Sequence, residues 1–268
     1  MSFVKVTEPR PGIKLVTLNR PDRMNAMAFD VMVPFREQLE EICYDNSVRA
    51  VVITGAGSSF CAGADLQDPG WLDMFNGLTV PGIARRAMRV LDDVIKTIRD
   101  MHQPVIAAVN GPAIGGGFCL AMAADIRLCN NDAVFRAAGI NNGLTSAELG
   151  LSYLLPRAIG SSASNEIMLT GRDVGGLEAE RKSIVSRCVA DDEDLLEASF
   201  DVAEQIQRHS RLGVELSKQM LNAGLEAGSL HAHMNHESHA QLFVRMTTKN
   251  FEEAIRARKD DREPDFQD

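Results

Sequence analysis

The sequence predicts an α/β core followed by an all-helical C-terminal region. Three short runs, at 12–21, 48–57 and 103–111, are rich in β-branched and apolar residues and have the pattern of strands. Between the last two runs, apolar residues recur at helical spacing over 84–101. After about residue 192 no strand pattern is found. Strands with intervening helices are typical of an α/β core, so the predicted fold class is α/β.

The remaining elements of the core are predicted in chain order. Residues 28–43 have a helical pattern, although Pro34 within them should kink or shorten the helix. A helix is expected over 118–124, directly after three glycines. A strand is expected over 126–129, directly after Asp125.

The C-terminal part is predicted to be helical throughout. Its apolar residues recur with helical periodicity in four segments, at 193–209, 213–226, 229–246 and 249–259. We therefore predict two parts, an α/β core over 1–192 and a helical region over 193–268.

Composition limits the class of protein. The 268 residues are 45% hydrophobic and 24% charged, as in ordinary soluble chains, and the net charge of −9 argues against nucleic-acid binding. No run approaches the roughly 18 apolar residues that cross a membrane. The first residues lack a signal-peptide pattern, so we expect a cytoplasmic protein. The five cysteines form no CxxC pair and are expected to be reduced: Cys43, Cys61, Cys119, Cys129 and Cys188.

Three consecutive glycines, Gly115–Gly117, stand between a predicted strand and a predicted helix. Taken alone, such a triplet could be a tight turn that permits close packing. Its position, however, places the amides of Gly116 and Gly117 at a helix N-terminus, where unpaired N–H groups stabilise negative charge. The chain has no GxGxxG fingerprint and no GxxxxGK[ST] loop. We therefore favour an oxyanion hole over a phosphate site.

An oxyanion hole usually needs a second donor, and residues 54–66 are where we expect it. This segment, TGAGSSFCAGADL, follows a buried strand and is rich in small residues that leave the main chain accessible. The same composition also suits an ordinary surface loop. The residues alone leave both interpretations open.

Four motifs resemble the crotonase superfamily, which contains enoyl-CoA hydratases and isomerases. GSSFCAGADL is followed along the chain by PVIAAVNGPAIGGGFCLAMAADIRL, and VTLNRPDRMNAM and FEEAIRARKDDREPDF flank them in family order. The resemblance implies a spiral of ββα units followed by a helical trimerisation region, assembled as a homotrimer or as a hexamer that is a dimer of trimers. It also implies an acyl-CoA thioester as substrate, with coenzyme A as part of that substrate and no separate cofactor.

The resemblance also implies which residues form the site. The oxyanion donors would be the backbone amides of Ala64 and Gly116. Basic residues of the C-terminal tail, Lys259 and Arg262, would reach the coenzyme A phosphates. The family's other coenzyme A contacts correspond to Arg23, Met24, Ala26, Ala62, Asp65, Leu66 and Ile114. For Asp65, hydrogen bonds to loop amides are favoured over proton transfer.

The sequence departs from the hydratase pattern at both catalytic glutamates. Cys119 stands at the first position and Gly139 at the second. Cys119 fits a small core residue better than a proton shuttle, since no cationic neighbour is evident. Glu148 is the best remaining acid–base group, because some isomerases of the family carry an acidic residue near this position. An acidic residue at the start of the next helix is equally consistent with Glu148.

Two further features concern ligands. The acyl pocket is expected to be bordered by 70–90, with Trp71, Met74, Phe75 and Ile83. The histidines of HAHMNHESH (231–239) include three at steps of three residues, which on a helix do not converge on one metal ion, so no metal site is expected.

The predicted reaction is enolate chemistry at an enoyl-CoA thioester, either hydration or movement of a double bond. The missing glutamates favour isomerisation, with Glu148 as the single acid–base group. The alternative is a non-catalytic protein that binds acyl-CoA.

Overall fold

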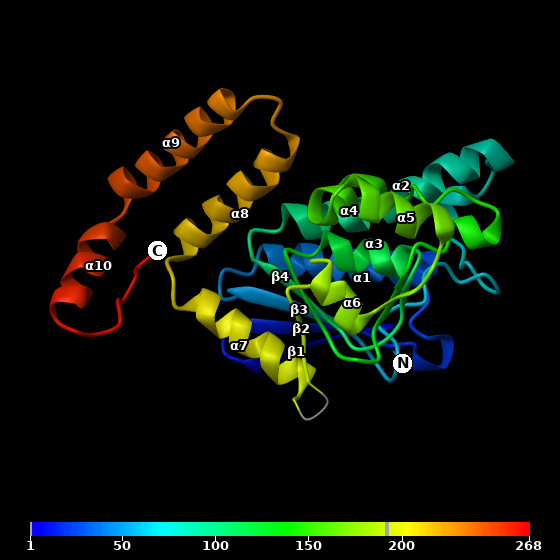
Figure 1. Cartoon of the computed structure of the whole chain (residues 1–268), viewed down its shortest axis with the longest axis horizontal. Coiled ribbons are helices and arrows are strands. Elements are labelled where there is room, and N and C mark those ends of the chain that lie inside the picture. Colours follow the sequence, from blue (N-terminus) through cyan, green and yellow to red (C-terminus); the bar gives the residue numbers. More distant parts are fainter. Residues whose placement is uncertain (1, 191–192) are drawn as a thin grey trace.

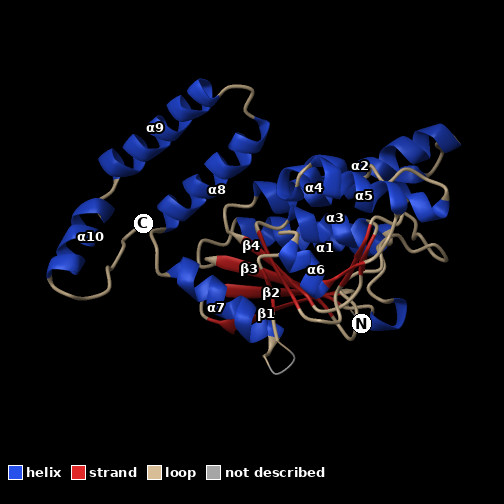
Figure 2. Cartoon of the chain, viewed as in Figure 1, coloured by secondary structure: helices blue, strands red, loops and turns tan. Residues whose placement is uncertain are grey.

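The computed structural model describes residues 2–190 and 193–268 and confirms the α/β class (Figures 1 and 2). The main sheet has the strand order β1-β2-β3-β4-β6-β9, in which only the β1–β2 pair is antiparallel. Its strands are β1 (Val4–Arg10), β2 (Ile13–Leu18), β3 (Ala50–Gly55), β4 (Val105–Val109), β6 (Ile126–Cys129) and β9 (Arg187–Cys188). A smaller sheet consists of β5 (Ala113–Ile114), β7 (Val134–Arg136) and β8 (Val174–Gly175).

Helices surround these sheets and form the C-terminal region. The core helices are α1 (Phe29–Cys43), α2 (Val80–Asp100), α3 (Gly116–Ala123), α4 (Leu151–Ile159), α5 (Ser161–Thr170) and α6 (Gly176–Arg181). The C-terminal helices are α7 (Leu195–Gln207), α8 (Arg211–Glu226), α9 (Leu230–Thr247) and α10 (Asn250–Lys259), which confirms the four helices predicted there. Short 3₁₀ turns lie at Pro21–Arg23, Asp73–Phe75 and Ile140–Asn142.

The structure contains several short elements absent from the sequence prediction, namely β5, β7, β8, β9, α5 and α6, and two further differences have a clear reason. Strand β1 is absent from the prediction, because its sequence VKVTEPR is polar and mostly exposed, as an edge strand can be. Pro34 does not shorten its helix, since α1 runs through Pro34 from Phe29 to Cys43. The apolar face of α1, which includes Phe35 and Leu39, is buried in the core, and this burial outweighs the roughly 3 kcal/mol that an interior proline costs.

The main sheet is covered on both faces. Alternate side chains of its strands pack with α1, α2 and α3 on one face. The other face, which includes Val52 and Ile106, packs against Leu195, Phe200 and Ala203 of α7. The predicted division after residue 192 falls at 191–192, outside the described residues. Of the helices after this division, α7 packs on the main sheet, whereas α8–α10 extend away from the sheet (Figure 1).

A buried ion pair fastens α8 to the core. The Lys218 ammonium lies 2.8 Å from Oδ2 of Asp125, and it also donates to the carbonyl of Gln103 at 2.9 Å. The Asp125 carboxylate accepts the amide of Val105 as well, which joins the turn before β6 to the start of β4. Asp125 therefore shapes the turn into β6. Among the described residues, no helix has both the length and the apolar composition that a membrane crossing requires.

Candidate active site

The loops after β3 and β4 are joined at one edge of the sheet. Because the two strands are parallel neighbours, their carboxyl ends lie side by side. The side chain of Asn110, which follows β4, accepts the amide of Gly55 at 3.2 Å and donates to the carbonyls of Gly55 and Gly57, both at 2.9 Å. The sequence prediction does not include this asparagine, although its place directly after a buried strand is a signal for it.

The segment around Ala64 is held between two other pieces of chain. Met27 donates to the carbonyl of Gly63 at 2.7 Å and accepts the amide of Asp65 at 2.9 Å. Since both neighbours of Ala64 pair with Met27, the N–H of Ala64 itself points away from Met27. Within the described residues this N–H has no protein acceptor.

The amide of Gly116 lies next to this segment. It is the first residue of α3, and its N–H likewise has no acceptor among the described residues. Gly63 has a φ of +80°, and a Cβ placed on it would lie 2.5 Å from the carbonyl oxygen of Ile114 and 3.3 Å from the nitrogen of Gly116. The loop of Ala64 and the start of α3 are therefore packed together through a residue that has to be glycine.

Glu148 lies at the same turn. Its Oε1 is 3.5 Å from the position that a Cβ on Gly115 would occupy. Gly150, with no side-chain cap, precedes α4, so the alternative that Glu148 caps this helix is not seen. No hydrogen bond or ion pair of the Glu148 carboxylate is found in the described part of the chain. Burial raises the pKa of this carboxyl above its ordinary value, because the charged form loses water.

Cys119 and Gly139, the two positions singled out by the sequence analysis, carry no carboxylate. Cys119 is fully buried, and burial raises the pKa of its thiol well above the ordinary value, with a further increase from the nearby Glu148 carboxylate. At Gly139 a Cβ would overlap the carbonyl oxygen of Thr145. The local backbone therefore has no room for a glutamate at 139.

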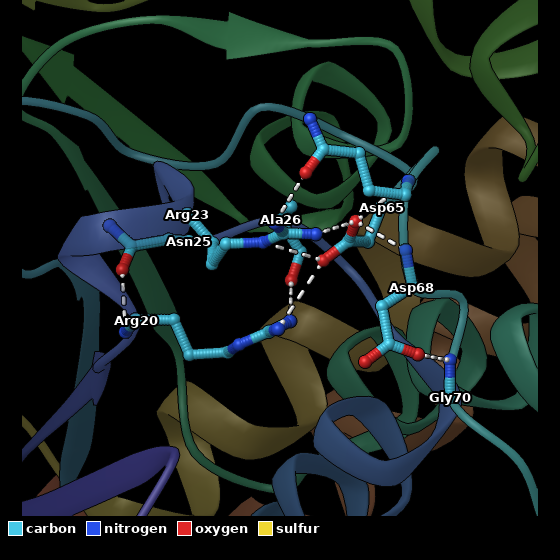
Figure 3. Close-up of polar contacts among 8 residues, drawn as sticks. Arg20, Arg23, Asn25, Ala26, Asp65, Asp68 and Gly70 are labelled. Atoms are coloured by element: carbon cyan, nitrogen blue, oxygen red, sulfur yellow. Dashed lines mark hydrogen bonds and ion pairs between the residues drawn. The ribbon is translucent and has the colours of Figure 1, made fainter.

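Asp65 is the centre of an ionic cluster (Figure 3). Its carboxylate lies 2.6 Å from Nη2 of Arg23 and 3.3 Å from Nη2 of Arg20, and it accepts the amides of Gln67 and Asp68 at 3.1 and 3.0 Å. The Arg23 guanidinium and these amides hold the pKa of Asp65 at about 2. The loop hydrogen bonds expected for Asp65 are present, and the charged carboxylate ties the loop of Ala64 to the N-terminal motif.

Asp65→Asn is expected to lower the free energy of unfolding by about 2 kcal/mol, since hydrogen bonds to charged groups contribute about 1.5–3 kcal/mol. The folded pKa of about 2 lies below the unfolded value of about 3.9. The wild-type carboxylate therefore stabilises the fold above about pH 4, and this contribution disappears as the pH falls to about 2. Urea unfolding at several pH values measures both effects. Asp68→Asn is the control, and an equal loss in the two variants would contradict the role of Asp65.

The other predicted binding residues are only partly close to this turn. Ala26 and Ala62 belong to the same packed loops, since the amide of Ala62 donates to the carbonyl of Met24 at 3.0 Å. Met24 and Leu66 have exposed side chains. The amide of Ile114 donates to the carbonyl oxygen of Cys61 at 2.9 Å.

The predicted phosphate-binding residues are not brought to the site in this single chain. Lys259 ends α10, and Figure 1 shows α10 well separated from α3 and α4. Nη1 of Arg262 lies 2.6 Å from Oε1 of Glu253, so the Arg262 guanidinium already forms an ion pair. Any role of these two residues in this site would require a neighbouring copy of the chain.

The predicted border of the acyl pocket is partly ordered by aromatic packing. Phe75 is buried and makes edge-to-face contacts with Phe29 and Trp71, at centroid distances of 5.3 and 5.5 Å. Trp71 and Met74 are exposed, and Ile83 is half-buried.

The histidine segment lies on α9. His233 is 3.4 Å from Glu237 on the same helix, and its ring approaches Gly224 of α8. His239 contacts the carbonyl of Asn235 at 2.6 Å. The contacts with Glu237 and Asn235 lie within α9, and the approach to Gly224 joins α9 to α8. The described residues contain no group of three His, Cys, Asp or Glu side chains that could hold a metal ion.

Comparison with known proteins identifies the relatives of this chain. A family profile described as "Enoyl-CoA hydratase/isomerase" matches residues 8–268. A probable enoyl-CoA hydratase of Mycobacterium tuberculosis is 60% identical over 268 residues, which are all of this chain and 94% of that protein.

Solved structures give the same result. The crystal structure of a probable enoyl-CoA hydratase/isomerase from Mycobacterium abscessus superposes with a TM-score of 0.95 at 60% identity, covering 99% of each chain. A monofunctional enoyl-CoA isomerase from M. smegmatis is 54% identical with a TM-score of 0.75, over 87% of this chain and 99% of that one.

Proposed function

The chain belongs to the enoyl-CoA hydratase/isomerase family, within the crotonase superfamily, and from this premise we propose that it moves a double bond along an enoyl-CoA acyl chain. In the proposed reaction Glu148 is the single acid–base group. The observation that carries the proposal is the place of its carboxylate, unpaired in the described chain and next to the Gly115 turn.

The proposed isomerisation uses one proton and one carboxylate. The Glu148 carboxylate removes a proton from the α-carbon of a 3-enoyl-CoA, and the electron pair passes into the thioester carbonyl to form a dienolate. The carboxylic acid then returns the proton to the γ-carbon, the carbonyl re-forms, and the product is a 2-enoyl-CoA. The carboxylate is regenerated, so no further reactant is needed.

The proposed oxyanion donors are the amides of Ala64 and Gly116. Both N–H groups have no protein acceptor in the described chain, and the loops that carry them pack together through Gly63. The N-terminus of α3 adds its dipole at Gly116. Donors held in place before the reaction stabilise the developing negative charge without reorganisation.

Hydration is the weaker candidate for this site. The hydratases that this chain resembles add water with two glutamates. Cys119 is a neutral buried thiol, and Gly139 has no space for a side chain. A single carboxylate is sufficient to move one proton between two carbons, and this favours isomerisation.

The proposed assembly is a homotrimer or a dimer of trimers formed through α8–α10. Large apolar side chains are exposed on these helices, and such surfaces are typical of interfaces: Leu221, Leu225, Leu230, Met234, Leu242, Phe243, Met246, Phe251 and Ile255. Light scattering tests this proposal, with an expected mass of three or six times 29.2 kDa. A monomer in solution would contradict it.

A substrate comparison tests the proposed reaction. Purified protein is incubated with a 3-enoyl-CoA and with crotonyl-CoA, and conjugation and hydration are followed separately by absorbance and by chromatography. We expect turnover of the 3-enoyl-CoA and little hydration of crotonyl-CoA. Tight binding of both thioesters without turnover of either would instead support a protein that only binds acyl-CoA.

The isomerisation rate at saturating substrate is expected to fall as the pH is lowered through the raised pKa of Glu148. Only the deprotonated carboxylate accepts the α-proton, and burial raises its pKa above the ordinary value of 4.5. The acid limb of the pH–rate profile should therefore lie above the pH at which an exposed glutamate titrates. A rate that stays constant throughout this range would contradict Glu148 as the base.

A further inference from the structure

We propose that Cys119 is a positioning residue that holds the main chain at Glu148 and so directs its carboxylate to the Gly115 turn. This inference rests on the proposed function of Glu148, because positioning is useful only if that carboxylate reacts. Cys119 stands where hydratases of the family carry a glutamate, and it acts here through another residue.

The contact that supports this role joins α3 to the segment before α4. The Sγ of Cys119 lies 3.6 Å from the carbonyl oxygen of Glu148, a distance at which a thiol donates a weak hydrogen bond. The same carbonyl accepts the amide of Leu151 at 2.8 Å. Because Cys119 is fully buried in α3, its position is fixed by the same helix that begins at Gly116. One helix thus carries both a proposed oxyanion donor and the group that holds Glu148.

The backbone after Glu148 is strained and needs such support. Leu149 has a φ of +45°, a left-handed conformation that non-glycine residues rarely adopt, and Gly150 follows with a φ of +81°. The Leu149 side chain is buried, with Cδ1 3.6 Å from the position of a Cβ on Gly116. Strained residues persist where their surroundings hold them, and they cluster at functional sites. The Cys119 contact lies at the residue where this strained turn begins.

The charges around Glu148 come from few groups. Within the described residues, no lysine, arginine or histidine pairs with its carboxylate, and the titratable side chain that interacts with it is the Cys119 thiol of α3. A change at Cys119 that loosens the turn would therefore admit water to the carboxylate. The titration of Glu148 then reports on its position, independently of turnover.

Three variants test the proposal. Cys119→Ala removes the donor, Cys119→Ser keeps a donor at the same place, and Cys129→Ala is a matched control at an equally buried cysteine of β6. The Glu148 pKa is measured by carbon-13 NMR of labelled glutamate, with its signal assigned by its loss in Glu148→Gln. Steady-state kinetics with a 3-enoyl-CoA give kcat and KM.

We expect Cys119→Ala to lower the Glu148 pKa toward its ordinary value and to lower kcat by about tenfold with KM nearly unchanged. A tenfold loss of kcat is larger than the effect of one weak hydrogen bond alone, and smaller than the roughly hundredfold loss that follows when a catalytic group is displaced by about 1 Å. Cys119→Ser should keep both the Glu148 pKa and kcat close to those of the wild type. Cys129→Ala should leave both unchanged while lowering stability.

Two results would overturn the proposal. One is an unchanged Glu148 pKa in Cys119→Ala, and the other is an equal loss of kcat in Cys129→Ala, which would mean a merely structural role. The proposed function fails by a different result, which is full turnover in Glu148→Gln. If neither the wild type nor any variant turns over the 3-enoyl-CoA, the NMR titration alone still decides whether Cys119 positions Glu148.

Discussion

Glu148→Gln is expected to slow the isomerisation of a 3-enoyl-CoA by about a thousandfold at saturating substrate, with KM nearly unchanged. A positioned acid–base group contributes about 10²–10⁴-fold, and neither Cys119, a neutral thiol, nor Gly139, which has no side chain, can replace it. Glutamine has nearly the same shape, so substrate binding should persist. Stopped-flow or steady-state absorbance of the conjugated product measures the change.

The control for this prediction is Glu37→Gln, at an exposed glutamate of α1. It removes the same charge from the chain and should leave kcat unchanged. Turnover that survives Glu148→Gln undamaged would remove Glu148 from the mechanism. A parallel rise in KM would instead assign it to substrate binding.

Gly63→Ala is expected to lower kcat by about 10²–10³-fold, the loss seen when one oxyanion donor is removed. The new Cβ would lie 2.5 Å from the carbonyl oxygen of Ile114 and 3.3 Å from the nitrogen of Gly116. It therefore has to displace either the loop of Ala64 or the start of α3, and each carries a proposed donor. Kinetics with a 3-enoyl-CoA give the loss, and circular dichroism verifies that the variant is folded.

A second glycine separates the clash from the backbone conformation. Gly160 has a φ of +82°, nearly equal to the +80° of Gly63, but a Cβ there meets no atom within 4 Å. Gly160→Ala therefore also places a side chain at a positive φ, but without the contact. Similar kcat losses in the two variants would contradict the oxyanion argument, because the effect would then come from backbone strain alone.

Sequence patterns are sufficient to predict most of the fold. Continuous apolar runs predict β3 and β4, and helical periodicity predicts α2 and the four C-terminal helices, because burial of one face is a local property of the chain. The polar edge strand β1 escapes such patterns, since an edge strand needs little burial. The helix is not shortened at Pro34, because the packing of α1 outweighs a local preference.

By itself, the sequence determined the family and pointed to the two loops proposed to form an oxyanion hole, because motifs are read directly from the chain. Only the tertiary structure decided where the Glu148 carboxylate lies. It follows the left-handed backbone conformation of Leu149, whose side chain is buried in the core. The same holds for Asp65, whose arginine partners are more than 40 residues away in the chain. Side-chain directions in loops are set by such long-range contacts, which local sequence does not contain.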